Sequence, residues 1–176
     1  MVAKVEQISP ATLATLLRYE SETGRLFWRY RPTERKCWNT RYAGKPALTA
    51  VDPDGYLHGR VLNLDCKAHR AIWAIVTGSW PVEHVDHVNG VRLDNRWMNL
   101  REANNQENRR NQKKYRGTSV YKGVSWRSDR RTWRAAAGMN GKNVHLGHFA
   151  TEEEAARAYD TFVLNNFGAF AHPNER

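Results

Sequence analysis

The chain has 176 residues, with 28 lysines and arginines against 18 aspartates and glutamates, so its formal net charge is +10. Its balance of 40% hydrophobic and 26% charged residues is typical of a globular protein, and the length allows one ordinary domain or two small ones. No apolar run approaches the roughly 18 residues that span a bilayer, and the first ten residues lack the apolar segment of a signal peptide, which argues against membrane and secreted proteins.

Residues 1–80 predict a small α+β unit with a modest core. A short helix is expected to begin at Pro10, where leucines recur at helical spacing. A strand over residues 24–30 leads into a loop that contains proline and arginine. After that loop, the Asp54-Gly55 turn and the alternation over residues 55–70 predict strands joined in a hairpin.

A buried helix is expected over residues 70–76, ended by the glycine at position 78 and the proline at position 81. Trp73 and Trp80 are expected in the core. From residue 82 the pattern changes to a strand that enters a tight turn at Asn89-Gly90, with a second short strand over residues 99–103. The polar residues that follow, rich in asparagine and arginine, are typical of a linker or of a helix with little to bury.

Residues 120–176 predict three strands and one helix. The strand-like runs are separated by a polar turn over residues 127–131 and by Asn140-Gly141, a strong hairpin signal. Thr151 and Glu154 fit a capping box at the start of an amphipathic helix. Such a helix covers one face of the sheet and leaves the other face open.

Two cysteines, Cys37 and Cys66, lie far apart and belong to no CxxC or Cys/His cluster. Their spacing excludes a zinc ribbon, and a disulfide framework would need more cysteines in a chain of this length. Free thiols in a reducing compartment are therefore expected.

Most of the excess of positive over negative charge lies in the middle of the chain. Residues 101–134 carry 11 basic and 3 acidic side chains. Tyr121, Trp126 and Trp133 interleave with arginines there, and bases or sugars can stack on such rings. The pattern favours a polyanion partner over a basic face that is merely solvated.

The candidate catalytic segment begins with His84-Val-Asp86-His87-Val-Asn89-Gly90 and continues with further aspartates and asparagines. Phosphodiester hydrolysis needs a base for the attacking water, a hard divalent cation and a group that holds the base in the right tautomer. Adjacent strand residues point to opposite faces, so Asp86 and His87 share a site only if a bend or turn brings them together. Alone, an Asp-His pair is most often a surface feature, and an asparagine cluster is most often loop chemistry.

The segment VDHVNGVRLDNRWMNLREANNQENRRN resembles the HNH nuclease motif of phage and intron-associated homing endonucleases, in which the order DHxNG, DNR, NLR and N recurs. The upstream segments LRYESETGRLFWR, DPDGYLHGRV and KAHRAIWAIVTGSWP resemble the same family. YKGVSWRSDRRTWRAAAGMNGKNVHLGHFATEEEAARAYD resembles the apetala/ethylene-response-factor type of DNA-binding domain. These resemblances cover nearly the whole chain, and both indicate DNA.

The HNH resemblance implies roles for four residues. His87 matches the general base that activates water, and Asp86 matches a metal ligand. Asn99 matches the residue that holds the loop and orients the base. Asn108 matches the second metal ligand, which implies an active-site helix rather than a linker around it. Many relatives have histidine at that position, so the asparagine oxygen here favours Mg²⁺ or Mn²⁺ over Zn²⁺, with one ion per active site.

Alternatives remain open around this motif. Asn104 or Asn105 takes the place of Asn108 if the register differs by a few residues. His84 touches DNA or the metal, or is simply exposed to solvent. His69 is expected to tie the start of a helix to the ribbon rather than to act in catalysis.

The apetala-type resemblance implies a sheet that lies in the major groove of DNA. Strand alternation predicts that His145 faces DNA and that His148 caps the sheet. Plant target sequences are not implied, because Lys122, Ser125 and Ala136 depart from the plant pattern. Trp133 is equally expected in the core of the sheet. Including the basic segment at 109–116, the expected DNA contacts are Arg109, Arg110, Lys113, Lys114, Lys122, Trp126, Arg127, Arg130, Trp133, Arg134 and Lys142.

The sequence thus predicts an α+β protein in three parts. An HNH nuclease domain over residues 1–112 has a ββα-metal core at about 82–112 and an N-terminal β-rich extension. A basic linker over residues 113–119 leads to an apetala/ethylene-response-factor-type domain over residues 120–176, with a three-stranded antiparallel sheet and one packed helix.

The predicted function is that of a sequence-specific, metal-dependent DNA endonuclease of the homing type, which hydrolyses phosphodiester bonds of double-stranded DNA and nicks as a monomer. We expect no membrane and no small-molecule substrate, a monomer or weak dimer, and action in the cytoplasm of an infected bacterial host. One alternative is a DNA-binding regulator with a vestigial nuclease motif. Another is an RNA-processing nuclease.

Overall fold

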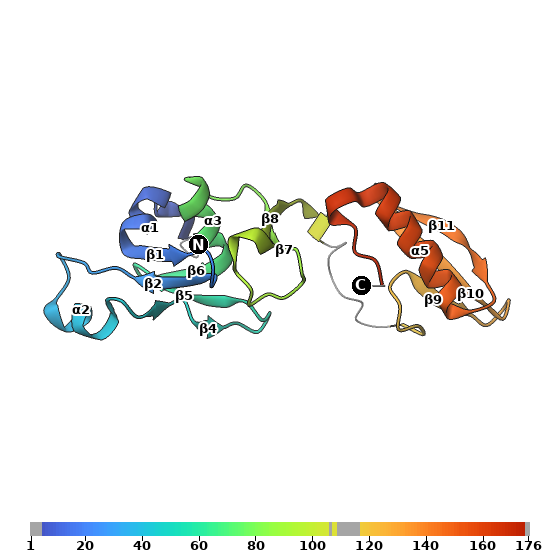
Figure 1. The fold of residues 1–176 in the computed structure, drawn as a ribbon, viewed down its shortest axis with the longest axis horizontal. Helices are drawn as coiled ribbons and strands as arrows, with labels where there is room; N and C mark the ends of the chain where they lie inside the picture. The colour runs from blue at the N-terminus through green and yellow to red at the C-terminus, as the bar shows by residue number, and fades with distance from the viewer. Residues whose placement is uncertain (1–4, 106, 109–116, 175–176) are drawn as a thin grey trace. The chain divides into compact units, whose positions relative to one another are not determined.

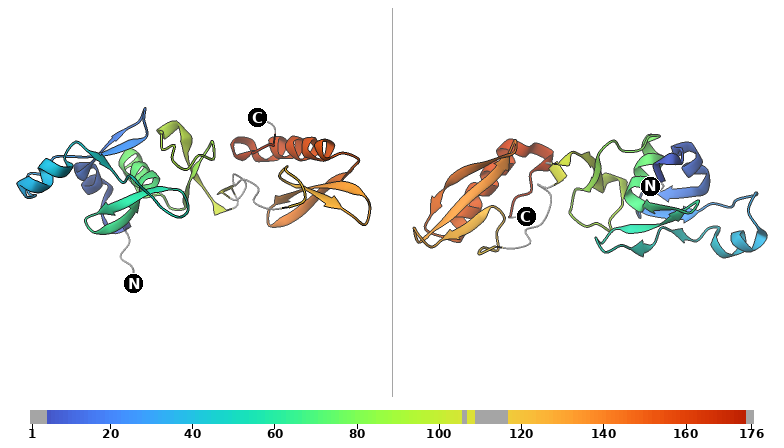
Figure 2. Two further views of the ribbon diagram at one scale, coloured as in Figure 1. Left: turned by 90° about the horizontal axis from the view of Figure 1, so that it is seen from below. Right: turned by 180° about the vertical axis from the view of Figure 1, so that it is seen from behind.

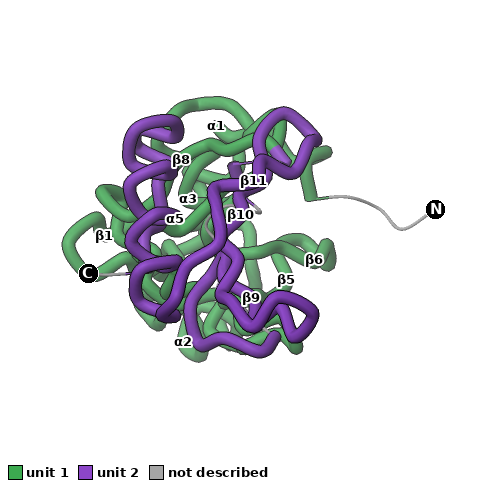
Figure 3. The backbone as a smooth tube through the Cα atoms, turned by 90° about the vertical axis from the view of Figure 1, so that its right-hand side faces the viewer, with its two compact units in different colours: residues 1–104 green, residues 105–176 purple. Residues whose placement is uncertain are grey.

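The structure, a computed structural model, describes residues 5–105, 107–108 and 117–174. It divides into two compact units, residues 1–104 (unit 1) and residues 105–176 (unit 2) (Figure 3). None of the helices in the described part of the chain is long and apolar enough to cross a membrane. The expected DNA contacts Arg109, Arg110, Lys113 and Lys114 lie outside the described residues.

Unit 1 is a mixed helix and sheet structure built from short elements. Its elements in chain order are η1 (Val5–Gln7), α1 (Pro10–Leu16), β1 (Leu17–Glu20), β2 (Arg25–Trp28), α2 (Lys36–Tyr42), β3 (Pro46–Ala47), β4 (Ala50–Val51), β5 (Leu57–Val61), β6 (Leu64–Lys67), α3 (Ala68–Thr77), β7 (His84–His87), η2 (Trp97–Asn99) and β8 (Leu100–Ala103) (Figure 1). They form the antiparallel sheets β1-β2-β3 and β4-β5-β6 and the two-stranded ribbon β7-β8.

Local sequence signals account for most of these boundaries. Ser9 caps α1, where its side-chain oxygen accepts a hydrogen bond from the backbone N–H of Thr12, and proline follows at the first helical position. Gly78 ends α3 in the left-handed conformation, with φ of 75°. The predicted helices at Pro10 and over residues 70–76 and the predicted hairpin before α3 are confirmed.

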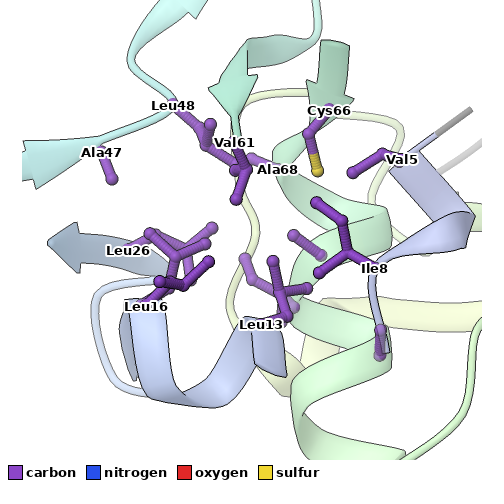
Figure 4. Packing of buried hydrophobic residues seen from close by; sticks show 14 of the residues in the cluster. Val5, Ile8, Leu13, Leu16, Leu26, Ala47, Leu48, Val61, Cys66 and Ala68 are labelled. Carbon is purple, nitrogen blue, oxygen red and sulfur yellow. The ribbon is translucent and has the colours of Figure 1, made fainter. Parts of the chain in front are cut away.

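The core of unit 1 lies between α1, α3 and the two three-stranded sheets (Figure 4). Leu13, Leu17, Val61 and Ile72 are fully buried there. The sulfur of Cys66 points into the same cluster, and burial raises the pKa of this thiol to about 12, so it stays protonated. Trp73 and Trp80 pack against the cluster, as predicted.

The segment expected as a loop after β2 contains a helix, α2, and the prediction there was wrong. The helix has no apolar periodicity because its stabilising contacts are aromatic and polar. The rings of Trp38 and Tyr42, one turn apart, lie 5.2 Å from each other. Buried Asn39 accepts a hydrogen bond from the backbone N–H of Arg31 and donates one to its carbonyl, at 2.9 and 2.8 Å.

Unit 2 has the sheet order β11-β10-β9 with one long helix packed on it. Its elements are β9 (Val124–Arg127), β10 (Thr132–Met139), β11 (Lys142–Phe149), α5 (Glu152–Phe167) and η3 (Gly168–Phe170). Figure 2 shows α5 lying along one face of the sheet. The predicted capping box of Thr151 and Glu154 is present, and the predicted three-stranded sheet with one helix is confirmed.

One strand prediction in unit 2 was wrong because β11 is irregular. Simple alternation puts His145 and His148 on opposite faces of the sheet. A register shift between Ala135 and Ala136 of β10 leaves Leu146 of β11 without a direct partner. This bulge changes the alternation, and the rings of His145 and His148 lie 4.8 Å apart.

Candidate active site

The predicted catalytic segment folds as the ribbon β7-β8 with an ordered loop between its strands. Asp86 pairs with Arg101 across the ribbon, and His87 pairs with Leu100 at the last position before the loop. The backbone N–H of Gly90 donates to the carbonyl of His87 at 2.8 Å, which closes the predicted turn. The alternation of the strand gives Asp86 and His87 different neighbours.

Asn99 holds this loop in place. Its side-chain oxygen accepts a hydrogen bond from the backbone N–H of Asn89 at 2.9 Å, and its amide donates to the carbonyl of Asp94 at 2.7 Å. The backbone N–H of Val88 donates to the carbonyl of Asn99 at 2.8 Å. A buried asparagine with these contacts fixes both ends of the loop next to His87.

His87 contacts a second buried asparagine, Asn95. The distance between His87 Nε2 and Asn95 Oδ1 is 2.9 Å, and Asn95 is only 1% exposed. With Asn95 Oδ1 as the acceptor in this contact, Nε2 carries the proton, which places the ring's lone pair on Nδ1. Burial lowers the pKa of His87, against the opposing effects of Asn95, Asp86 and Asp94, so the imidazole is neutral at neutral pH.

Two further rings surround His87. The rings of His69 and His87 lie 5.3 Å apart in an edge-to-face arrangement, and Tyr56 lies 4.9 Å from His69 and 5.8 Å from His87. His69 Nδ1 is buried and has no hydrogen-bond partner among the described residues. Burial lowers the pKa of His69 to about 3, and repulsion from His87, once that ring is protonated at low pH, is the next cause. His69 is therefore a neutral wall of the site at neutral pH. The predicted link between the start of α3 and the ribbon is therefore present as a ring contact.

The loop itself is anchored to β1 and to the turn that follows it. The Tyr19 hydroxyl donates to the carbonyl of Asn95 at 2.9 Å. Gly24, with φ of 70°, lies so close to the loop that a Cβ there would meet the backbone nitrogen of Arg96 at 2.5 Å. Hydrogen bonds from Arg96 and from Asn89 lower the pKa of the Asp94 carboxyl to about 2 and keep it charged.

Asp86 is buried and ion-paired. Its Oδ2 lies 2.8 Å from Nη2 and 3.0 Å from Nε of Arg101. The described residues contain no cluster of three or more His, Cys, Asp or Glu side chains that would hold a metal ion. The predicted donor pair, the Asp86 carboxylate and the Asn108 amide oxygen, instead fits a hard cation such as Mg²⁺, which takes few protein ligands and keeps several waters. In the structure the Asp86 carboxylate has the Arg101 guanidinium as a cationic partner.

The other predicted ligand lies in unit 2. Asn105, Glu107 and Asn108 have helical backbone, as the active-site helix requires, and Asn108 is half-buried. Asp86 and Asn108 belong to different units, and their convergence on one ion stays a prediction. Asn104 lies before the helical residues, and His84 is exposed on β7.

The open face of the unit 2 sheet carries a basic cluster. Arg134 Nε lies 3.4 Å from His145 Nδ1, and Arg130 Nη1 lies 3.4 Å from His148 Nε2. A hollow of about 300 Å³ is lined by Arg127, Arg130, Arg134, His145 and His148. Burial and the neighbouring Arg130 lower the pKa of His148. The arrangement gives a concave cationic surface for an anion such as a phosphate.

The remaining expected DNA contacts in unit 2 differ in their surroundings. Trp126 and Trp133 are cross-strand partners with rings 5.1 Å apart, and Trp133 packs against the core beneath α5. Lys122 lies just before β9, where burial lowers its pKa to about 8. A second hollow, of about 660 Å³, is lined by Lys122, Arg134 and Lys142 among others.

Comparisons with known proteins agree with this geometry. The family model for HNH endonucleases matches residues 66–110, which include α3, the ribbon and the asparagine loop. An uncharacterized HNH endonuclease of Acanthamoeba polyphaga mimivirus is 35% identical over 111 residues, 62% of this chain and 57% of that protein. Protein 3.8 of Escherichia phage T7 is 35% identical over 97 residues, 54% of this chain and 80% of that protein. Residues 66–110 are an HNH endonuclease domain.

Unit 2 of this HNH protein contains an AP2 domain, whose family model matches residues 119–169. An AP2-like ethylene-responsive transcription factor of Arabidopsis thaliana is 43% identical over 61 residues, 34% of this chain and 12% of that protein. The chain thus spans little more than half of the mimivirus relative and a small part of the plant factor. Both resemblances seen in the sequence, to HNH nucleases and to the apetala-type domain, are confirmed.

Sequence reasoning assigned no role to two residues of the HNH site. Asn95 lies within the DNR motif, and its contact with His87 depends on how the loop folds back, which periodicity does not show. Arg101 lies in the NLR motif, and its pairing with Asp86 follows from the ribbon register, which becomes visible only when the two strands are aligned.

Proposed function

We propose that the protein is a metal-dependent DNA endonuclease of the homing type that hydrolyses phosphodiester bonds of double-stranded DNA. The observation that carries the proposal is the buried, neutral His87, held by Asn95 Oδ1 in the tautomer with its lone pair on Nδ1. The HNH endonuclease domain supports the chemistry, and the AP2 domain supports DNA as the substrate.

In the proposed reaction, His87 accepts a proton at Nδ1 from the attacking water. Asn95 keeps the imidazole in this tautomer, while Asn99 fixes the loop that carries Asn95. Asp86 and Asn108 hold one Mg²⁺ or Mn²⁺, which when bound supplies polarisation of the phosphate and stabilisation of the leaving oxygen. His69 and Tyr56 exclude water from one side of the imidazole.

DNA is held by the AP2 domain and by the basic segment before it. The outer face of the sheet, with Arg127, Arg130 and Arg134, binds phosphates and base edges, and the arginines suit bidentate contact with guanine. Lys122, Lys142 and the tryptophans Trp126 and Trp133 complete the proposed reader. Replacement of Arg109, Arg110, Lys113 and Lys114 by glutamine should weaken binding to all sequences alike and flatten its salt dependence, as measured by anisotropy titration.

One proposed active site per chain implies that a monomer cuts one strand in each binding event. Supercoiled plasmid that carries the target should therefore be converted first to open circle, and to linear DNA only later. A linear product without an open-circle stage contradicts nicking by a monomer. The relative in Escherichia phage T7 supports the further proposal that the protein acts in the cytoplasm of an infected bacterium.

The decisive variant is His87→Ala. It should abolish cleavage in Mg²⁺ and leave DNA affinity within a few-fold of the wild type, because the base takes part in chemistry and not in holding DNA. His58→Ala, which removes an imidazole from β5 outside the site, is the matched control and should cleave normally. Absence of cleavage in the wild type on every DNA tested would favour the alternative, a DNA-binding regulator. Displacement of bound DNA by structured RNA, at RNA concentrations similar to the DNA concentrations that give binding, would favour the other alternative, an RNA-processing nuclease.

A further inference from the structure

The segment around α2 carries a concentration of positive charge that the proposed nuclease and reader do not use. Residues 29–45 hold six basic side chains and one acidic side chain, a surplus of five. The rest of residues 1–100 holds eight basic and nine acidic side chains. The rest of residues 1–100 is therefore close to neutral, and the positive charge of this region is concentrated in the short segment.

Most of these cations lack a counter-charge. Arg31 pairs with Glu34 at 3.2 Å. The other basic side chains of the segment are exposed, and among the described residues none of them has a carboxylate within 4.0 Å: Arg29, Arg35, Lys36, Arg41 and Lys45. We call these five residues the α2 patch. Like charges held close together repel one another, and a polyanion removes that repulsion when it binds.

The helix that carries the patch is held in a fixed place. The ring of Trp38 lies edge-to-face against Trp28 of β2 at 5.7 Å, and the Arg31 guanidinium lies 4.5 Å over Trp38. Asn39 bonds to both backbone groups of Arg31. The cations of the patch are therefore presented on a preformed surface, which reduces the ordering cost of binding.

The aromatic rings also indicate which nucleic acid fits. Single strands are bound by exposed rings on which bases stack. Here Arg31 already covers the face of Trp38, so the ring serves as a support rather than a stacking platform. Tyr30 is an exposed ring in the same segment, but it is a single ring among five cations. What the patch mainly offers is point charges for a phosphate backbone, which suits a duplex whose bases are already stacked.

We propose that the α2 patch is a second DNA-binding surface, which holds the phosphate backbone of duplex DNA away from the cleavage site. Figures 1 and 2 show α2 at the end of unit 1 opposite β7 and β8, so the patch is separate from the candidate active site. The identity of the ligand as duplex DNA rests on the proposed function. The contact adds to affinity and not to chemistry.

The test compares two double variants of the full chain, Arg35→Gln with Arg41→Gln, and the control Arg18→Gln with Arg25→Gln. All four side chains are exposed in unit 1, and each pair removes two charges. Binding to a 40-base-pair duplex is followed by fluorescence anisotropy in EDTA, over a range of salt concentrations. The α2 variant should bind about 10-fold more weakly at physiological salt, with the slope of log K against log salt reduced by about two, while the control stays near the wild type.

Equal affinity and slope for the α2 variant and the wild type would overturn the inference, as would equal losses in the two variants. Loss of RNA binding with duplex binding intact would overturn it in favour of an RNA partner. Because the assay contains no divalent cation, it is independent of cleavage. If the wild type never cuts DNA but the α2 variant binds DNA more weakly, only the proposed nuclease function is refuted. If the wild type cuts DNA and the α2 variant binds DNA as tightly as the wild type, only the DNA-binding role of the α2 patch is refuted.

Discussion

Asn95 Oδ1 lies 2.9 Å from His87 Nε2, and both side chains are buried. The contact decides which nitrogen of the imidazole carries the proton, and so which nitrogen can act as the base. Asn95 is itself held by the Tyr19 hydroxyl on its carbonyl and by the close approach of Gly24. The tautomer of the proposed base is thus set by a loop that β1 and the turn after it hold in place.

We expect Asn95→Ala to lower the cleavage rate about 10- to 100-fold with little change in DNA affinity, because the imidazole loses the acceptor that orients it. In Asn95→Asp an acceptor remains, but its negative charge stabilises the imidazolium and raises the pKa of His87. The acidic limb of the cleavage–pH profile should therefore move to higher pH in Asn95→Asp. An unchanged profile in both variants would show that Asn95 does not set the tautomer.

His69 should make stability depend on pH. Its pKa is about 3 in the folded protein against 6.5 in the unfolded chain, so the unfolded state binds more protons between these values. The free energy of unfolding should therefore fall as pH falls from 6.5, by about 1.4 kcal/mol per pH unit once His69 is protonated in the unfolded state. Urea titrations at several pH values should show this dependence of the unfolding free energy on pH in the wild type and a weaker dependence in His69→Phe. An equal dependence in both proteins would show that other titratable groups cause it.

How much of this could be predicted from the sequence depended on the range of each interaction. The capping box at Thr151 and the hairpin before α3 are local, so residue type and spacing were enough to predict them. The helix α2 was missed because its stability comes from Trp28 and the loop at Arg31, which lie outside the helix. The same holds for the bulge in β11, which brings His145 and His148 together and depends on pairing with β10.

The candidate site shows the same division. His87, Asp86 and Asn99 were predicted from motif order, and the structure gives Asn99 the loop contacts that order implies. The partners that tune them, Asn95 and Arg101, depend on tertiary folding that a linear pattern does not carry.

Arg101 should weaken metal binding, because its positive charge occupies the side of Asp86. We expect Arg101→Gln to lower the melting temperature in EDTA, since a buried carboxylate loses its guanidinium partner. Added Mg²⁺ or Mn²⁺ should then raise the melting temperature more in Arg101→Gln than in the wild type, because binding to the folded state alone stabilises it. Arg96→Gln, which breaks the more exposed pair with Asp94, is the control. A smaller metal shift in Arg101→Gln would mean that Arg101 supports the ion rather than competing with it.

The glycine beneath the loop offers a test with an internal control. Gly24 and Gly44 have similar backbone angles, φ of 70° and 76°, so alanine at either position costs roughly 1 kcal/mol of backbone strain. Only at Gly24 does a Cβ meet the loop, whereas at Gly44 nothing described lies within 4 Å. Gly24→Ala should therefore lose more stability in urea titrations and should lower the cleavage rate of the remaining folded protein by displacing Asn95. Equal behaviour of the two variants would show that the loop adjusts without cost to the base.

DNA binding by the AP2 domain should strengthen as pH falls below 6.5. Burial and the neighbouring Arg130 lower the pKa of His148 in the free protein, so its protonation is incomplete there. A phosphate in the hollow beside His148 favours the charged imidazolium and raises the pKa of His148 in the DNA complex. DNA binding is therefore accompanied by the uptake of a proton. DNA affinity should rise as pH falls between the pKa of His148 in the complex and its pKa in the free protein. Anisotropy titrations in EDTA at pH 5.5 and 7.5 should show this rise in the wild type and a smaller one in His148→Gln. His58→Gln, outside the AP2 domain, should retain the full rise, and an equal rise in all three proteins would place the proton on another group.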